Sequence, residues 1–448
     1  MSNATENPSH YSRRSLLKLL GTSAASAPFI SNRLMAESTT NTVRHASFGA
    51  DGMAWADLQQ ISNCPNVEIV AVCDVDMNRM TQAKKRFPKA RFYQDWRGLL
   101  DKEAKNLDSV NVSTPDHMHA PIGLSAMQLG KHVYGQKPLA HDLYETRRMT
   151  EMATTSKIVT QMGIQIHATA YYRIAAQVMR DGVIGKIREV HSWCAKSWGD
   201  RSAKPDKTDP VPEGFDWNLW LGVCADRPFI GGDYYHPENW RKRLDFGTGT
   251  LGDMGCHIFD PLFMGLGLGA AISVRSEGPA PNEHNWALDG KVIYQFKGTP
   301  LTEGETLDIF WYDGAASPPA DVIAQTGKNE LPQSGSILIG SAGVMLLPHY
   351  KLPEFSPKEK FKDYQFPRIK GVNHWGQFID ACRGTGKTEA DFTYSGPLTE
   401  AILIGGIASR FPNTTLKWNS QDLKFDLEPA NSLVRRNYRE GWKIPGLG

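Results

Sequence analysis

Strand-like and helix-like segments alternate over 43–165, and this alternation restricts the fold more than any other feature of the sequence. Apolar, β-branched runs typical of buried strands occur at 43–48, 67–73, 109–112, 132–134 and 158–161. The stretches between them are long enough to cross from one parallel strand to the next as helices. The pattern therefore predicts an α/β domain built on a parallel sheet.

The turn after the first expected strand is similar to a dinucleotide-binding turn, whose pattern is Gly-x-Gly-x-x-Gly/Ala. Gly49 and Ala54 fit its first and third positions, whereas Asp51 stands at the second. Gly52 is placed to take over that role, with the helix N-terminus still facing the phosphates. We therefore predict cofactor contacts from Gly49, Asp51, Gly52 and Met53.

Asp74 ends the second expected strand, about 20 residues after the glycine turn. A carboxylate at that distance accepts hydrogen bonds from ribose hydroxyls and repels a 2′-phosphate, which favours NAD over NADP. The alternative is an ordinary aspartate in a turn after a strand.

Asp253 and His257 lie four residues apart, the spacing that stacks side chains on one helical face. An imidazole can move a proton near neutral pH, and a nearby carboxylate can hold its orientation. Pro261 cannot donate to the carbonyl of His257, so the helix is either kinked there or begins at 260–261. A purely structural Asp–His pair is the alternative.

Several segments together resemble the glucose–fructose oxidoreductase / inositol dehydrogenase (Gfo/Idh/MocA) family. They are the Gly-Lys-His-Val strand and Lys137-Pro138 within 130–140, Ser-Thr-Pro at 113–115 with His119, 182–186, Asp253 with His257, and 398–400. Gln136 stands where the family usually has Glu. The resemblance covers nearly all of 43–442. It implies a Rossmann domain followed by an α+β domain with a large, open, mainly antiparallel sheet, often assembled into a homodimer or homotetramer.

The resemblance also implies roles for individual residues. Lys137 would be the signature lysine that stabilises an alkoxide, His257 the acid/base, and Asp253 its neighbour at the substrate hydroxyls. One base and one cation are the minimum for removing a hydride from a carbinol. The nicotinamide side of the cofactor site would include Thr114, Pro115, His119, Gln136 and Lys137.

We divide the chain into a signal and linker (1–42), an NAD-binding domain (43–165) and a substrate and oligomerisation domain (166–448). A segment rich in Pro, Gly and Trp, 200–245, is expected to cover the sugar site, although a packed surface loop is the alternative. Candidate substrate-binding residues are Gln165, His167, Tyr235, His236, Trp240 and Arg241. Other expected elements are strands at 187–198, 292–296, 306–312, 336–340 and 344–347, helices at 216–222 and 373–381, and a loop at 352–367.

The N-terminus matches a twin-arginine export signal, with Arg13-Arg14 in 12–18 followed by a mildly apolar run at 19–30. This run is too short for a stable membrane anchor, and cleavage is expected after Ala36. We predict export to the periplasm by the twin-arginine machinery, which carries folded proteins, with NAD tightly bound. A chance Arg-Arg in a disordered tail is the alternative.

Net charge and cysteine spacing limit the classes of ligand that the protein is expected to bind. A net charge of +2 gives no polybasic surface for nucleic acid. The six cysteines are scattered without zinc-like spacing, so we expect free thiols and no metal site.

These features predict an NAD-dependent oxidoreductase acting on a secondary hydroxyl of a sugar, glycoside or cyclitol. A second hypothesis is an NAD-dependent glycosidase that oxidises its substrate transiently, eliminates the aglycone and reduces the product again. The third is a non-catalytic NAD- or sugar-binding protein.

Overall fold

The computed structural model describes residues 42–447. The twin-arginine motif and its expected cleavage site therefore lie outside the described residues. Within 42–447, no helix combines the length and the hydropathy needed to cross a lipid bilayer.

The N-terminal part of the described chain forms a six-stranded parallel sheet with strand order β3-β2-β1-β4-β5-β6. This order confirms the predicted Rossmann architecture. The strand β3 was not predicted, because its residues are only partly buried and do not form the apolar run typical of a central strand. The strands are β1 (Val43–Phe48), β2 (Val67–Cys73), β3 (Arg91–Tyr93), β4 (Ser109–Val112), β5 (His132–Gly135) and β6 (Thr160–Met162). The helices between them are α2 (Met53–Ser62), α3 (Thr81–Arg86), α4 (Trp96–Glu103), α5 (His119–Gln128) and α6 (Leu143–Thr155).

The strand order reverses between β1 and β4, where such sheets open a crevice at their carboxyl ends. Gly49 follows β1 there, with a positive φ of 101°. A Cβ on Gly49 would lie 2.6 Å from the carbonyl oxygen of Ser113, which follows β4. Only glycine allows this close approach.

The C-terminal part of the described chain forms a nine-stranded sheet with strand order β13-β12-β11-β7-β10-β9-β8-β14-β15. Of the strand pairs described in this second sheet, only β7–β10 is parallel. The prediction of a mainly antiparallel sheet is therefore confirmed. The strands are β7 (Ile187–Cys194), β8 (Ala271–Ser276), β9 (Lys291–Lys297), β10 (Thr306–Asp313), β11 (Ser334–Gly340), β12 (Val344–Pro348), β13 (Glu354–Ser356), β14 (Thr415–Asn419) and β15 (Lys424–Phe425). The strand expected at 187–198 ends at Cys194, and the loop expected at 352–367 contains β13 and the short helix α11 (Lys358–Phe361).

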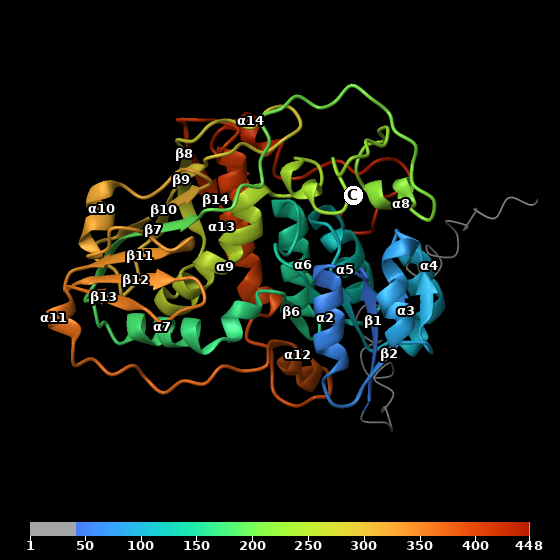
Figure 1. Cartoon of the computed structure of the whole chain (residues 1–448), viewed down its shortest axis with the longest axis horizontal. Helices are drawn as coiled ribbons and strands as arrows, with labels where there is room; N and C mark the ends of the chain where they lie inside the picture. Colours follow the sequence, from blue (N-terminus) through green and yellow to red (C-terminus); the bar gives the residue numbers. More distant parts are fainter. Residues whose placement is uncertain (1–41, 448) are drawn as a thin grey trace, which may run out of the picture.

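Helices α9 (Gly249–Leu266) and α13 (Phe392–Ala408) lie between the two sheets (Figure 1). A Cβ on Gly255 would lie 2.8 Å from Ile402, so this glycine allows close packing of the two helices. Helix α9 runs without a break through Pro261, which excludes a helix start at 260–261. The remaining helices are α7 (Ala170–Arg180), α8 (Trp217–Leu221), α10 (Ala320–Gln325), α12 (His374–Cys382) and α14 (Glu428–Asn431).

The C-terminal part of the chain returns to the first sheet. Phe378 and Ile379 of α12 belong to the same buried cluster as Leu58 and Ile61 of α2. Helix α13 also packs against α6 and β6. The nucleotide-binding half is therefore completed by residues from the far end of the sequence.

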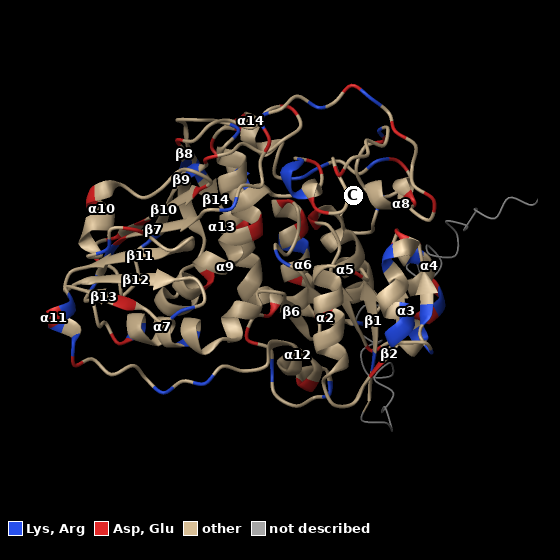
Figure 2. Cartoon of the chain, viewed as in Figure 1, with Lys and Arg blue, Asp and Glu red and all other residues tan. Residues whose placement is uncertain are grey.

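All six cysteines are free thiols, as predicted. Acidic and basic residues are interspersed over most elements (Figure 2). Within 42–447, no cluster of three or more His, Cys, Asp or Glu side chains has a geometry that could hold a metal ion.

Candidate active site

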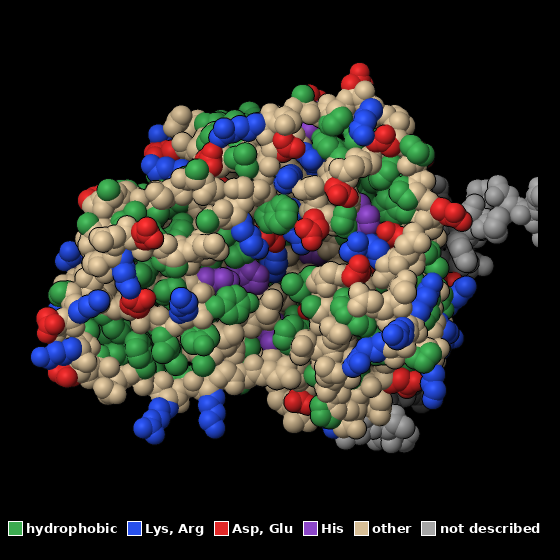
Figure 3. Space-filling view, in the orientation of Figure 1, with side chains coloured by type: hydrophobic (Ala, Val, Ile, Leu, Met, Phe, Trp, Pro, Cys, Tyr) green, Lys and Arg blue, Asp and Glu red, His purple; other side chains and the backbone are tan. Residues whose placement is uncertain are grey.

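A cavity of about 720 Å³ lies between the carboxyl ends of the parallel strands and α9. In Figure 3, Lys, Arg and His side chains gather around a hollow in the middle of the molecular face. Ligand cavities in proteins commonly have this size. The predicted residues that line it are Gly49, Asp51, Gly52, Met53, Asp74, Thr114, Pro115, His119, Gln136, Lys137, Gln165, His236, Trp240, Arg241, Asp253 and His257.

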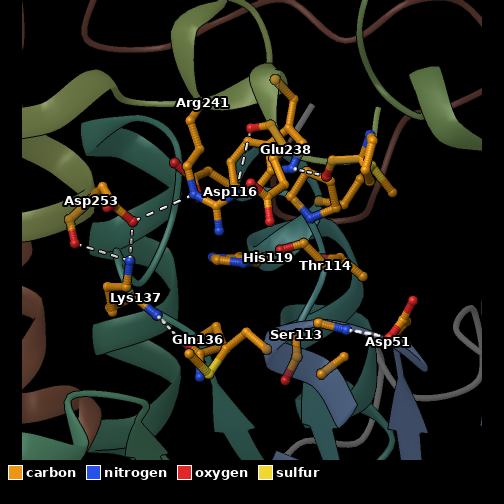
Figure 4. Close-up of a pocket in the computed structure, with 18 of the residues that line it drawn as sticks. Asp51, Ser113, Thr114, Asp116, His119, Gln136, Lys137, Glu238, Arg241 and Asp253 are labelled. Carbon is orange, nitrogen blue, oxygen red and sulfur yellow. Dashed lines mark hydrogen bonds and ion pairs between the residues drawn. The ribbon is translucent and has the colours of Figure 1, made fainter. Parts of the chain in front are cut away.

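Lys137, just after β5, is bound to Asp253 on α9 (Figure 4). Its Nζ donates to Oδ1 of Asp253 at 2.6 Å and to the backbone carbonyl of the same residue at 2.9 Å. Both side chains are about one-tenth exposed. This ion pair joins two segments far apart in the sequence at the wall of the cavity.

Asp253 has further partners on a neighbouring segment. Its Oδ2 accepts hydrogen bonds from Nε1 of Trp198 at 2.9 Å and from Nζ of Lys196 at 3.4 Å, and Nε of Arg241 lies 3.5 Å from Oδ1. Burial alone would raise the pKa of Asp253, but the charges of Lys137, Arg241 and Lys196 bring that pKa well below its usual range. Asp253 is therefore a fixed anion.

The expectation that this carboxylate orients His257 is not met, because Asp253 makes no hydrogen bond with it in the described structure. The buried Nδ1 atom of His257 has no hydrogen-bond partner among residues 42–447. Burial, the charge of Lys137 and nearby His349 lower the pKa of His257 well below 6.5. At neutral pH its imidazole is uncharged and able to accept a proton.

The glycine turn leaves room for an anionic group. A Cβ on Gly52, which has a φ of 58°, would meet no atom closer than Nη2 of Arg79 at 4.0 Å. The N–H of Gly52 is bound to Oδ1 of Asp51 at 2.8 Å and that of Ala54 to the Asp51 carbonyl at 3.1 Å. Among the described residues no side chain caps the N-terminus of α2, which leaves the other N–H groups of its first turn for a pyrophosphate. The negative charge of Asp51 is balanced by Arg79 at 2.9 Å. The turn therefore fits a dinucleotide.

Asp74 also holds this turn in place. Its carboxylate accepts the backbone N–H groups of Ala50 at 2.9 Å and Asp76 at 3.0 Å. Burial raises the pKa of Asp74 to about 6. Asp74 therefore stabilises the turn after its strand, which is the alternative role given in the sequence analysis. It also lines the cavity, as a residue that binds the ribose would.

Gln136 departs from the family's usual glutamate, and the structure supplies a reason. Its Nε2 donates to Oδ2 of the buried Asp57 at 2.8 Å. Asp57 also accepts from Ser113 at 2.8 Å and from Trp375 at 2.9 Å, and within the described part of the chain no cation is among its hydrogen-bond partners. An amide can donate to this carboxylate, whereas a second ionised carboxylate would repel it.

Gln136→Glu is therefore expected to destabilise the fold at pH 7.5 by about 2 kcal/mol, because two buried carboxylates would be in contact. The loss should shrink toward pH 5, where one of the two retains a proton and can donate. Denaturant unfolding at both pH values measures it. Gln60→Glu, on the exposed face of α2, is the matched control. An equal loss at both pH values would contradict this account.

His119 connects two parts of the cavity wall. Its Nδ1 lies 2.8 Å from the carbonyl oxygen of Pro138, and its Nε2 lies 2.8 Å from that of Thr114. Both ring nitrogens are thus engaged by the backbone. The ring positions the segment after β5, where Lys137 lies.

Two predicted substrate residues do not line the cavity. His167 is buried, and its Nδ1 pairs with Oδ1 of Asp260 at 2.8 Å. Tyr235 is 2% exposed and packs among aromatic rings that include Trp217 and Trp220. Both predictions are wrong, because each side chain is buried in the protein interior.

Several cavity residues escaped the sequence reasoning. Lys196 and Trp198 come just after β7, where the expected strand was continued too far to place them in a loop. Arg79, Asp116 and His349 are further examples. A search for charged or aromatic residues just after strands would have found Lys196, Trp198 and His349.

Comparison with known proteins shows which family the chain belongs to. Residues 43–164 match the model of the Gfo/Idh/MocA oxidoreductase family, NAD-binding Rossmann fold. Residues 185–300 match the model of its C-terminal alpha/beta domain, and the two models together cover more than half of the chain. The chain belongs to the Gfo/Idh/MocA oxidoreductase family.

Curated relatives match the chain in part. Levoglucosan dehydrogenase of Pseudarthrobacter phenanthrenivorans is 24% identical over 190 residues, which are 42% of this chain and 40% of that protein. Glycosyl hydrolase family 109 protein 1 of Shewanella sp. (strain ANA-3) is 25% identical over 154 residues, or 32% of this chain and 33% of that protein. The chain thus spans less than half the length of these curated relatives.

A solved structure supports the fold over a longer range. The WlbA dehydrogenase from Bordetella pertussis, crystallised with NADH and UDP-GlcNAcA, superposes with a TM-score of 0.59 at 16% identity. The match covers 84% of this chain and 99% of that one. The two-domain architecture is therefore shared.

Proposed function

We propose that this protein is an NAD-dependent oxidoreductase that reversibly oxidises a secondary hydroxyl of a sugar, glycoside or cyclitol. The observation that carries the proposal is that Lys137 and His257 line the same cavity as the glycine turn 49–52. Bound NAD would accept a hydride from the carbinol carbon.

The roles of the chain's residues follow from their charge states. The ammonium of Lys137 stabilises negative charge on the carbinol oxygen, and Asp253 fixes the position of that ammonium. His257, uncharged at neutral pH, accepts the hydroxyl proton. Gly52 and the N-terminus of α2 would hold the pyrophosphate, and Asp74 the ribose.

The segment 200–245 brings Trp240, Arg241 and His236 to the cavity, which supports its role as a cover over the sugar. Together with Gln165, these residues are the substrate contacts we propose. We further propose export to the periplasm, supported by Arg13-Arg14, and a homodimer or homotetramer, supported by the family's open sheet.

A redox-assisted glycosidase is the second candidate, favoured by the similarity to a glycosyl hydrolase family 109 protein. Oxidising a hydroxyl to a ketone acidifies the adjacent C–H. Loss of that proton then expels the aglycone with its bonding electron pair. Addition of water and return of the hydride complete the cycle without net consumption of NAD.

One set of measurements tests both candidates. The purified chain is denatured, and the released nucleotide is identified, with NAD expected. The intact protein is then mixed with sugars, cyclitols and aryl glycosides without added nicotinamide. Stoichiometric reduction of bound NAD indicates the dehydrogenase, whereas catalytic release of aglycone indicates the glycosidase. If NAD is bound but neither reaction occurs, the protein is a binding protein and both proposals fail.

A further inference from the structure

The sugar end of the cavity holds more positive than negative charge. Three cations, Lys137, Lys196 and Arg241, surround one carboxylate, Asp253. In Figure 4, Lys137, Arg241 and Asp253 lie at one side of the cavity and Asp51 at the other. The excess is therefore separate from the turn expected to hold the pyrophosphate.

Lys137 and Asp253 satisfy one another at 2.6 Å, but the other two cations do not find equivalent partners. Lys196 approaches Asp253 at 3.4 Å and Arg241 approaches it at 3.5 Å, both longer than a good charged hydrogen bond. A lysine has three donors and an arginine five. Most of these donors are left for a ligand or for water.

The remaining acids cancel only part of this charge. Asp116 accepts a hydrogen bond from Thr248 at 2.6 Å; burial raises its pKa, and the charges of Lys137 and Arg241 act against that rise. Glu238 is on the rim, exposed, and forms no ion pair with Lys196 or Arg241 in the described structure. Oxidised nicotinamide would add one more positive charge at the same end.

Lys196 lies nearer the opening of the cavity than Arg241, as the exposure of the two side chains shows. The Lys196 side chain is 53% exposed and that of Arg241 23%. The guanidinium carbon of Arg241 lies 4.3 Å from the ring centre of Trp240 and 5.3 Å from that of Trp198. Stacking on these rings holds the fork of N–H groups in place before a ligand arrives.

We propose that the substrate is a sugar that carries a carboxylate, such as a uronic acid or its glycoside, and that Lys196 and Arg241 bind this carboxylate. The inference rests on the proposed function and specifies its substrate class. A planar carboxylate matches the guanidinium fork, and the exposed lysine at the mouth attracts the anion on entry. The hydroxyl to be oxidised then lies toward Lys137 and His257.

The test uses the NAD-loaded full chain and matched pairs of sugars: glucose with glucuronate, galactose with galacturonate, and glucose 6-phosphate as a different anion. Two quantities are measured, the kcat/KM for reduction of bound NAD and the rise in melting temperature caused by each sugar. At least one uronate should exceed its neutral counterpart by about 10-fold or more in kcat/KM, since a hydrogen bond between charged groups contributes that much. The same uronate should give the larger rise in melting temperature.

Lys196→Met should reduce this preference by about 10-fold, and Lys196→Arg, which keeps the charge, should restore most of it. Lys204→Met is the matched control, because Lys204 is an exposed lysine of the same segment outside the cavity. Melting temperatures without sugar report whether each variant is folded.

The outcomes separate the two proposals. If neutral sugars reduce bound NAD as well as uronates do, or if the sugar phosphate is preferred, the carboxylate inference is overturned and the oxidoreductase stands. If uronates raise the melting temperature through Lys196 but no sugar reduces NAD, the inference is supported and the oxidoreductase is overturned. If no sugar has either effect, both fail.

Discussion

Lys137→Met is expected to lower kcat for sugar oxidation by about 10²–10³-fold, the usual cost of removing one charged donor from a developing oxyanion. KM should change less, because the alkoxide forms only in the transition state. Single-turnover reduction of bound NAD measures the step directly.

Loss of Lys137 leaves Asp253 buried beside Lys196 and Arg241, so the variant should still fold, and its melting temperature checks this. Lys297→Met, at the exposed end of β9, is the matched control and should retain full activity. A Lys137→Met enzyme with near-normal kcat would remove the lysine from the proposed mechanism.

His257→Ala is expected to lower kcat by about 10²–10⁴-fold, the contribution of a positioned general base. The uncharged imidazole is the active form, and it predominates above its pKa. Because burial, Lys137 and His349 lower that pKa well below 6.5, protonation of His257 should not reduce wild-type kcat/KM between pH 8 and 6.5. Activity should be lost only in more acidic solution.

A pH–rate profile of the wild type and a single-turnover comparison with His257→Ala test this together. His284→Gln replaces a histidine outside the cavity and serves as the control. A wild-type profile that falls with an apparent pKa near 7, and that persists in His257→Ala, would assign the base to another group.

The parallel sheet and the glycine turn could be predicted because each has a local signature, whereas the grouping of Lys137, Asp253 and His257 was implied by the resemblance to the Gfo/Idh/MocA family. Strands read as apolar runs, and Lys137-Pro138 and the Asp253–His257 spacing are short motifs. The partners of those residues could not be predicted in this way. Lys196 and Trp198 reach Asp253 through the packing of β7 beside α9, which no local pattern encodes.

The two wrong predictions of substrate-binding residues have the same cause. His167 and Tyr235 lie in segments that reach the cavity through Gln165 and His236, but their side chains turn toward the interior. Sequence identified the segments, while tertiary packing decided which of two neighbouring side chains faces the ligand.

The packing of α12 against α2 has a consequence for how the chain acquires its structure during synthesis. Leu58 and Ile61 bury their apolar surface partly against Phe378 and Ile379, which emerge from the ribosome more than 300 residues later. The nascent nucleotide-binding half therefore keeps an uncovered apolar stripe until translation is nearly finished. Chaperones bind such exposed apolar surface, so production of this protein should depend on them more than expected for two domains that each fold from one continuous stretch of chain.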